Sequence, residues 1–176
     1  TISEFLKRYP GHELADDGLY IVGEIHYSSG NYTDAITAMT NLMLGHSKSD
    51  KRLDALYTRA YSKFLIQNYS EASKDFSAVL QQYPRSRYEM SSTFRLADCR
   101  YMEKKYSDAL LLYRRVSTET NDVNDRLGAQ YQEAQTLLRL DRYEESARIL
   151  RALFTNNSDS AYADDSYFHM ASIYAN

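Results

Sequence analysis

The chain has 176 residues, 43% of them hydrophobic, and its 21 basic and 24 acidic side chains leave a formal net charge of -3. This length allows one domain with a buried core, and a charge so close to neutral gives no electrostatic reason to expect nucleic acid as a partner. A single cysteine, Cys99, excludes an internal disulfide and a cysteine-based metal cluster, and no apolar run reaches the ~18 residues of a membrane-spanning helix.

A repeat of 37 residues runs through the whole chain. Its most regular markers are tyrosines that each open a similar phrase, which are Tyr32, Tyr69, Tyr106 and Tyr143. The same step links a column of small residues, which are Gly23, Ala60, Ala97, Ala134 and Ala171. It also links two mainly aromatic columns, which are Tyr20, Tyr57, Phe94, Tyr131 and Phe168 in one and Tyr27, Phe64, Tyr101 and Leu138 in the other. A period of this length predicts an array of stacked structural repeats.

In chain order, residues 1–10 match the end of a repeat unit, because Tyr9-Pro10 corresponds to Tyr83-Pro84 two periods later. Full units are predicted at 11–47, 48–84, 85–121 and 122–158, and residues 159–176 match the first helix of a further unit. Both edges of the sequence fall inside a unit. We therefore expect a single array over 1–176 that belongs to a longer protein.

Each unit is predicted to contain two helices. In the first, Tyr57, Ala60 and Phe64 are three to four positions apart and so share one helix face. The second is expected to begin at the polar residue after the marker tyrosine, such as Ser70. Neither helix can bury its apolar stripe alone, so the pairs must stack on one another. The predicted fold class is all-α, an α-solenoid in which the small residues let neighbouring helices approach closely.

These residues resemble the tetratricopeptide repeat family. The family pattern is carried by Gly23, Gly30, Tyr32 and Ala35 in one copy and by Ala60, Tyr69, Ala72, Phe76 and Pro84 in another. The period of 37 departs from the family's ~34, with the extra residues before the first helix. The resemblance implies helix-turn-helix units in a right-handed superhelix with a concave groove.

The longer repeat resembles a bacterial cell-envelope branch of the family, which includes the periplasmic repeat protein of the Tol-Pal system and the repeat lipoprotein of outer-membrane assembly. The phrase that carries this likeness is Tyr9-Pro10-Gly11-His12-Glu13-Leu14-Ala15-Asp16-Asp17. The likeness implies a periplasmic or outer-membrane-associated scaffold. A cytoplasmic location is the alternative.

In this family the first helices face the groove, so the resemblance implies which residues would contact a partner. The candidate set is Tyr20, Glu24, Tyr27, Tyr57, Tyr61, Phe64, Arg95, Asp98, Tyr101, Tyr131, Gln135 and Arg139. Tyrosine suits such a surface because it combines a large apolar body with a polar tip. The two aromatic columns have a competing interpretation as packing between repeats. The non-repeating residues are the better specificity candidates, because stacking does not require Tyr61, Glu24, Asp98, Gln135 or Arg139.

The resemblance implies a non-enzymatic scaffold that binds a peptide segment or a partner helix in its groove. A second hypothesis of another class is that the repeats are the regulatory or substrate-delivery arm of an enzyme whose catalytic domain lies outside residues 1–176. Self-association through exposed terminal repeats is a third. The expected partner is a protein or peptide, with no nucleic acid, no cofactor and no direct insertion into a membrane.

No catalytic or metal-binding site is predicted. The histidines share no metal-ligand spacing, and Cys99 is expected to be a small buried thiol. Basic residues gather in the third unit between Arg85 and Arg115, but acidic residues interleave with them, which favours a solvated surface of mixed charge. Paired acids such as Asp16-Asp17 are expected at helix starts, where they complement the helix dipole.

Overall fold

The computed structural model describes residues 1–156 and 162–174, and every element of regular structure in these ranges is an α-helix. The chain divides into two compact units, unit 1 with residues Thr1–Ser92 and unit 2 with residues Thr93–Asn176. The all-α prediction is confirmed over the described part of the chain. The predicted boundary between 122–158 and 159–176 lies outside the described residues.

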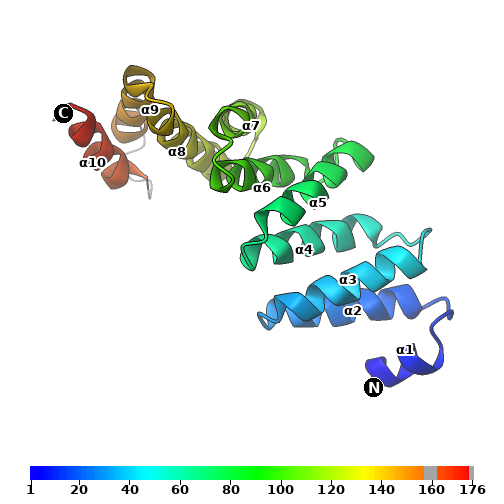
Figure 1. Ribbon diagram of the computed structural model, residues 1–176. Helices are drawn as coiled ribbons and strands as arrows, with labels where there is room; N and C mark the ends of the chain where they lie inside the picture. The colour runs from blue at the N-terminus through cyan, green and yellow to red at the C-terminus, as the bar shows by residue number, and fades with distance from the viewer. Residues whose placement is uncertain (157–161, 175–176) are drawn as a thin grey trace. The chain divides into compact units, whose positions relative to one another are not determined.

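Unit 1 contains a short helix followed by two helix pairs (Figure 1). Their bounds are α1 Ile2–Arg8, α2 Ala15–Ser28, α3 Tyr32–Gly45, α4 Arg52–Leu65 and α5 Tyr69–Gln82. Each helix from α1 to α4 packs against the next one in the chain, and α2 also packs against α4. The first helices of successive pairs are therefore neighbours, which is the stacking that the repeat predicts.

In unit 2 the helix pairs follow the same order. Helix α6, Glu89–Met102, reaches into this unit and is followed by α7 Tyr106–Glu119, α8 Val123–Arg139, α9 Tyr143–Asn156 and α10 Ala163–Tyr174. Ala97 of α6 packs against Ala109 and Tyr113 of α7, and each later helix packs against its successor. None of the described helices combines the length and the apolar character needed to cross a bilayer.

The column of small residues lies, in its first four members, at the contact between the two helices of a pair. Ala60, Ala97 and Ala134 are completely buried. At Gly23, an added Cβ would lie only 2.5 Å from the terminal methyl carbon of Met39. The residues in register with Met39 on the later second helices are large and buried, and they are Phe76, Tyr113 and Leu150. The predicted pairing of small with large side chains is confirmed.

The last members of two columns differ from the prediction. Phe168, expected to pack between repeats, is 69% exposed, and Ala171 is exposed as well. Both lie on α10, which packs against α9 but has no further described helix after it in the chain. A residue of the repeating pattern becomes buried only when a neighbouring helix covers it.

The turns inside the helix pairs repeat as regularly as the helices. Gly30, Gln67, Lys104 and Asp141 all have positive φ, between 57° and 77°. Each is the left-handed residue that ends a first helix, and the amide of the next residue donates to a carbonyl five positions earlier, as from Asn68 to Lys63 at 2.9 Å. Only the first of these four positions carries the glycine that such a backbone favours.

The second helices begin at the marker tyrosine, one residue earlier than predicted. The reason is a backbone hydrogen bond: the carbonyl of the residue before the tyrosine already accepts from an amide four positions on, as Asn68 does from Ala72 at 2.9 Å. The predicted acids do lie in the first turns, including Asp16 and Asp17 in α2. There they complement the positive end of the helix dipole.

Candidate functional site

The first helices of unit 1 form a surface that we call the aromatic face. It consists of Tyr20, Glu24 and Tyr27 of α2, Tyr57, Tyr61 and Phe64 of α4, and Tyr88 from the connection before α6. Every member is half-buried. On α4, the rings of Tyr57 and Tyr61 stack with centroids 6.1 Å apart, and Tyr61 meets Tyr27 of α2 edge-on at 6.3 Å. The rings therefore form a continuous row across two repeats.

Sequence reasoning missed Tyr88, which extends this row. Its ring stacks on Tyr57 with centroids 4.0 Å apart, and its hydroxyl donates to Asp54 Oδ1 at 2.7 Å. A signal was present in the sequence, because Tyr162 follows Tyr88 after two full periods. In unit 2, Tyr162 packs on Tyr131 with centroids 5.3 Å apart, just as Tyr88 packs on Tyr57. The pair recurs in alternate repeats, so a search at one period does not find it.

One aromatic column of the candidate set packs beside the turns that connect the two helices of each pair. Tyr27, Phe64 and Tyr101 each meet the marker tyrosine of the following helix at a steep angle, with centroids 5.9, 5.5 and 5.3 Å apart. In the fourth unit Leu138 replaces the ring, and Tyr143 is 50% exposed. In this column the aromatic rings therefore pack between the two helices of a pair.

Glu24 contributes to the stacking of repeats, contrary to the expectation for non-repeating residues. Its Oε1 accepts a hydrogen bond of 2.9 Å from Thr58 Oγ1, which joins α2 to α4. Burial, followed by the negative charges of Glu24 and Asp54, raises the pKa of the neighbouring Tyr20 to about 12. The carboxylate thus lies beside tyrosines whose hydroxyls stay protonated at neutral pH.

The acidic residues of unit 1 differ in whether a cation neutralises them. Asp17 lies 3.5 Å from Lys51 Nζ, and Asp54 pairs with Arg87. Glu24 has no basic side chain within 4.0 Å among the residues that the structure describes. The aromatic face therefore carries a half-buried carboxylate to which the described side chains supply no counter-ion.

The corresponding surface of unit 2, which we call the mixed face, has different chemistry. It consists of Arg95, Asp98 and Tyr101 of α6 and Tyr131, Gln135 and Arg139 of α8. Asp98 accepts from Tyr113 Oη at 2.7 Å and pairs with Arg95 at 2.6 Å, while Arg139 Nε donates to Tyr101 Oη at 3.1 Å. Burial raises the pKa of Asp98, and these two donors oppose the shift. Arg139 thus joins α8 to α6, whereas the contacts of Asp98 lie within its own helix pair.

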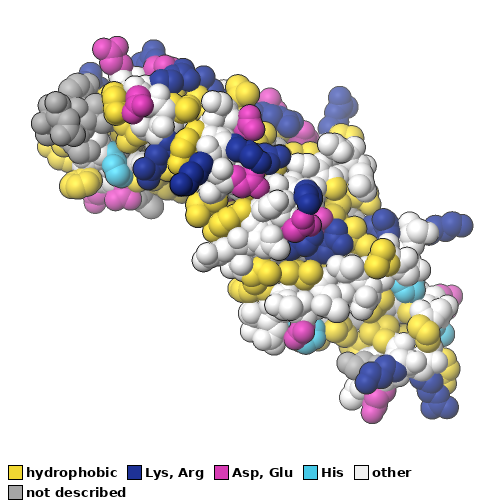
Figure 2. Space-filling view, viewed as in Figure 1, with side chains coloured by type: hydrophobic (Ala, Val, Ile, Leu, Met, Phe, Trp, Pro, Cys, Tyr) yellow, Lys and Arg dark blue, Asp and Glu magenta, His cyan; other side chains and the backbone are white. Residues whose placement is uncertain are grey.

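The basic residues of the third predicted unit do not form a separate patch. Arg100 and Lys105 both pair with Glu103, at 3.0 and 2.7 Å, and Arg114 pairs with the buried Glu133 at 2.7 Å. On the face of unit 2 that Figure 2 shows, basic and acidic side chains lie interspersed. The predicted mixed-charge surface is confirmed.

The remaining reactive side chains are placed as follows. Cys99 is completely buried, which confirms the prediction of a small buried thiol, and burial raises the pKa of this thiol to about 12. Within residues 1–156 and 162–174, no cluster of three histidine, cysteine or acidic side chains could hold a metal ion.

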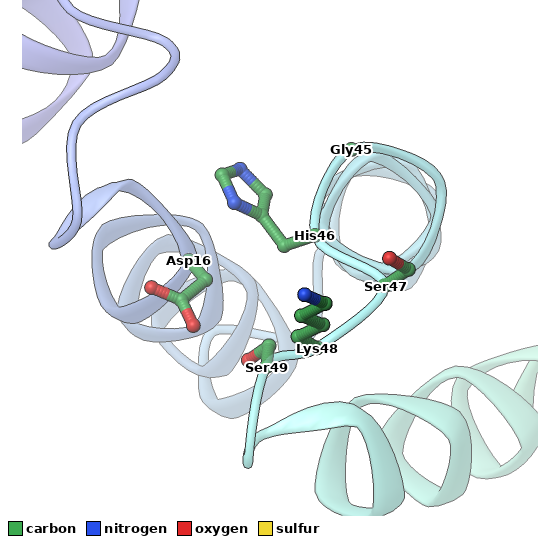
Figure 3. Close-up of a pocket in the computed structure, with 6 residues that line it drawn as sticks. All are labelled: Asp16, Gly45, His46, Ser47, Lys48 and Ser49. Carbon is green, nitrogen blue, oxygen red and sulfur yellow. The ribbon is translucent and has the colours of Figure 1, made fainter.

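A shallow hollow lies beside the connection from α3 to α4 (Figure 3). It is lined by Asp16 of α2 and by Gly45, His46, Ser47, Lys48 and Ser49. A hydrogen bond with Ser49 lowers the pKa of Asp16. This contact fastens the connection to the start of α2, and the hollow is open to solvent.

The arrangement of helix pairs matches solved structures of known repeat proteins. One is a protein from Podosopora anserina that is described as a kinesin light chain and has TPR-like repeats nearly identical to one another. It superimposes with a TM-score of 0.71 at 14% identity, covering 94% of this chain and 88% of that chain. A tetratricopeptide repeat protein from Parabacteroides merdae gives a TM-score of 0.76 at 20% identity, covering 99% of this chain and 67% of that chain. This chain has a tetratricopeptide-like fold.

One family of sequences matches part of this tetratricopeptide-like array. The outer membrane lipoprotein family YfiO matches residues 48–119, which is less than half of the chain and runs from just before α4 to the end of α7. A search of curated protein sequences finds no match. Neither the lipoprotein family nor these two repeat proteins bears the name of an enzyme.

Proposed function

We propose that the chain is a protein-binding scaffold and that the aromatic face of unit 1 binds a segment of another protein. The observation that carries this proposal is the row of half-buried rings formed by Tyr88, Tyr57, Tyr61 and Tyr27. Each ring is held by its neighbours and by the helices beneath it. A partner that covers such rings gains apolar contact area at a small cost in side-chain entropy.

The fold supports this proposal, because stacked helix pairs commonly present extended surfaces for binding. The first helices α2 and α4 lie side by side and place their rings on one surface. An extended peptide or one face of a helix could lie along such a row. The polar tips of the tyrosines and the carboxylate of Glu24 would then supply the directional contacts.

A finer proposal concerns the location of the protein. We propose that it works in a bacterial cell envelope, in the periplasm or at the outer membrane, because the outer membrane lipoprotein family matches the helices from α4 to α7. Fractionation of cells that express the full-length protein tests this idea. Recovery with periplasmic or outer-membrane markers is expected, and recovery with cytoplasmic enzymes would contradict it.

The binding proposal can be tested with peptides selected from a random library displayed on phage, using the folded chain as bait. We expect Tyr61→Ser to weaken the selected peptides by about tenfold or more, because a tyrosine at the centre of an interface contributes at least 1–2 kcal/mol. The matched control is Tyr143→Ser, since Tyr143 is an exposed tyrosine outside the aromatic face. Circular dichroism verifies that both variants fold. Equal affinities of wild type and Tyr61→Ser would remove the aromatic face from the proposal.

A further inference from the structure

The described residues use only part of the hydrogen-bond acceptor capacity of Glu24. Thr58 Oγ1 donates to its Oε1 at 2.9 Å, and no basic side chain of the described residues reaches it. The basic side chains nearest along α4 are already paired, because Arg59 and Lys63 both contact Asp75 at 2.8 Å. A half-buried carboxylate without a counter-ion has lost part of its hydration without compensation.

Tyrosines from two neighbouring helices lie near this carboxylate. Tyr20 and Tyr27 lie one turn before and one turn after Glu24 on α2. On α4, Tyr57 and Tyr61 lie on either side of Thr58, the residue that bonds to Glu24. The rings of Tyr27 and Tyr61 meet across the two helices with centroids 6.3 Å apart. Tyrosines of both repeats therefore lie near the hydrogen bond between Thr58 and Glu24.

A carboxylate close to tyrosine rings is a suitable binding site for a cation. The faces of aromatic rings attract ammonium and guanidinium groups, and a partly desolvated carboxylate forms a strong charge-assisted hydrogen bond with them. A guanidinium can also stack flat on a tyrosine while it donates to the carboxylate. An acidic side chain or a C-terminal carboxylate would instead be repelled.

We propose that Glu24 anchors a basic side chain, arginine or lysine, of the protein segment that binds the aromatic face. The inference rests on the proposed function and specifies the chemistry of its partner. Glu24 supplies the charge, Tyr27 and Tyr61 supply the ring surfaces, and Thr58 holds the carboxylate in place.

The first test uses small probes and does not depend on finding a natural partner. Blocked arginine amide and blocked lysine amide are titrated into the chain while the NMR signals of the tyrosine rings and of Thr58 are followed. The neutral blocked citrulline amide is the matched probe. We expect saturable shifts at Tyr27, Tyr61 and Thr58 with the cationic probes and at least about tenfold weaker binding of citrulline. Equal binding of charged and neutral probes would overturn the inference.

Matched variants then assign the effect to Glu24. Glu24→Gln keeps an oxygen that can accept from Thr58 but removes the charge, so the fold is retained and the response to cationic probes should fall by about tenfold. Glu13→Gln makes the same change in an exposed loop of the same unit and should leave the response unchanged. Tyr61→Phe, which keeps the ring, should bind the probes, and Tyr61→Leu, which removes it, should not. Unchanged binding by Glu24→Gln would overturn the inference.

Peptides selected on the wild-type chain separate this inference from the proposed function. Each arginine in a peptide is replaced by citrulline and each lysine by acetyl-lysine, and affinities are measured for wild type and for Glu24→Gln. We expect one replacement to weaken binding to wild type by about tenfold and to have little effect on the variant. A peptide that depends on Tyr61 but on no basic residue would overturn the inference while the proposed function stands.

Discussion

The rings of Tyr57 and Tyr88 lie nearly parallel, with planes inclined by 6° and centroids 4.0 Å apart. Tyr57 belongs to α4, whereas Tyr88 ends the connection that leads from α5 into α6. The hydroxyl of Tyr88 also donates to Asp54, one turn before Tyr57 on the same helix. One side chain thus fastens this connection to α4 through both an apolar and a polar contact.

We predict that Tyr88 stabilises unit 1 through two separable contributions. Tyr88→Phe removes only the hydrogen bond to Asp54 and should lower the free energy of unfolding by about 1 kcal/mol. Tyr88→Leu also removes the stacked ring and should lower it by about 2 kcal/mol in all. Urea denaturation monitored by circular dichroism measures both values. The control is Tyr143→Phe, at an exposed tyrosine whose hydroxyl bonds to Asp141, and it should leave stability nearly unchanged. A Tyr88→Leu variant as stable as wild type would contradict the prediction.

The left-handed turn residues should accept glycine. Gln67 has a φ of 61°, and a side chain in this backbone conformation costs about 1 kcal/mol relative to glycine. We therefore expect Gln67→Gly to raise the free energy of unfolding by about 0.5–1 kcal/mol. Gln67→Ala keeps the Cβ and should give no gain. The reverse change Gly30→Ala, at a φ of 77°, should lower stability. Thermal and urea unfolding of the three variants provide the measurement.

The buried carboxylate of Asp75 should be important for the stability of unit 1. It receives two hydrogen bonds of 2.8 Å from Arg59 and lies 2.8 Å from Lys63, so it joins α5 to α4. Asp75→Asn leaves two partly buried cations without their common partner and should cost about 3 kcal/mol of unfolding free energy. Glu71→Gln disrupts a more exposed pair with Lys74 and should cost much less, because solvent screens this pair. Similar losses of unfolding free energy in Asp75→Asn and Glu71→Gln would contradict the prediction that burial makes the ion pairs of Asp75 more important for stability.

The thiol of Cys99 should be protected by the fold and should make stability depend on pH in alkaline solution. Burial raises its pKa to about 12 from an ordinary value of 9.0. Between these two values, an unfolded chain releases the thiol proton while the folded chain retains it. The unfolded state then binds fewer protons, so stability falls as pH rises above about 9. In the folded protein, the rate at which thiol reagents modify Cys99 should be limited by the rate at which the structure opens and exposes the thiol.

Cys99→Ser provides the comparison that isolates this effect. Serine suits the position because Ser62 and Thr136, in the same register, each donate to the carbonyl four residues earlier, at 2.8 and 2.7 Å. The variant should therefore fold. The difference in unfolding free energy between wild type and variant should be constant below about pH 9 and should shift against wild type above it. A difference that does not change with pH would contradict the burial of the thiol.

The positions that make up much of the candidate surface could be predicted, but the contacts that each side chain makes could not. The repeating columns correctly indicated which positions of the first helices lie beside neighbouring helices, because burial follows the period. The variable positions were harder to interpret. Asp98 and Arg139 do not repeat, yet each bonds to a tyrosine of its own unit, since a polar contact between helices can be completed by different pairs in different repeats.

The amino-acid sequence by itself determined the helix pairs, their period and the small-against-large packing at residues such as Ala60 and Phe76. These features depend on local helix periodicity and on contacts that recur at one constant separation. Only the tertiary structure decided that Tyr88 completes the aromatic row, that Phe168 stays exposed and that Glu24 lacks a counter-ion among the described side chains. Those outcomes depend on which side chains contact one another across neighbouring helices. Such contacts are set by distances in the folded structure, and the spacing of residues along the chain does not determine them.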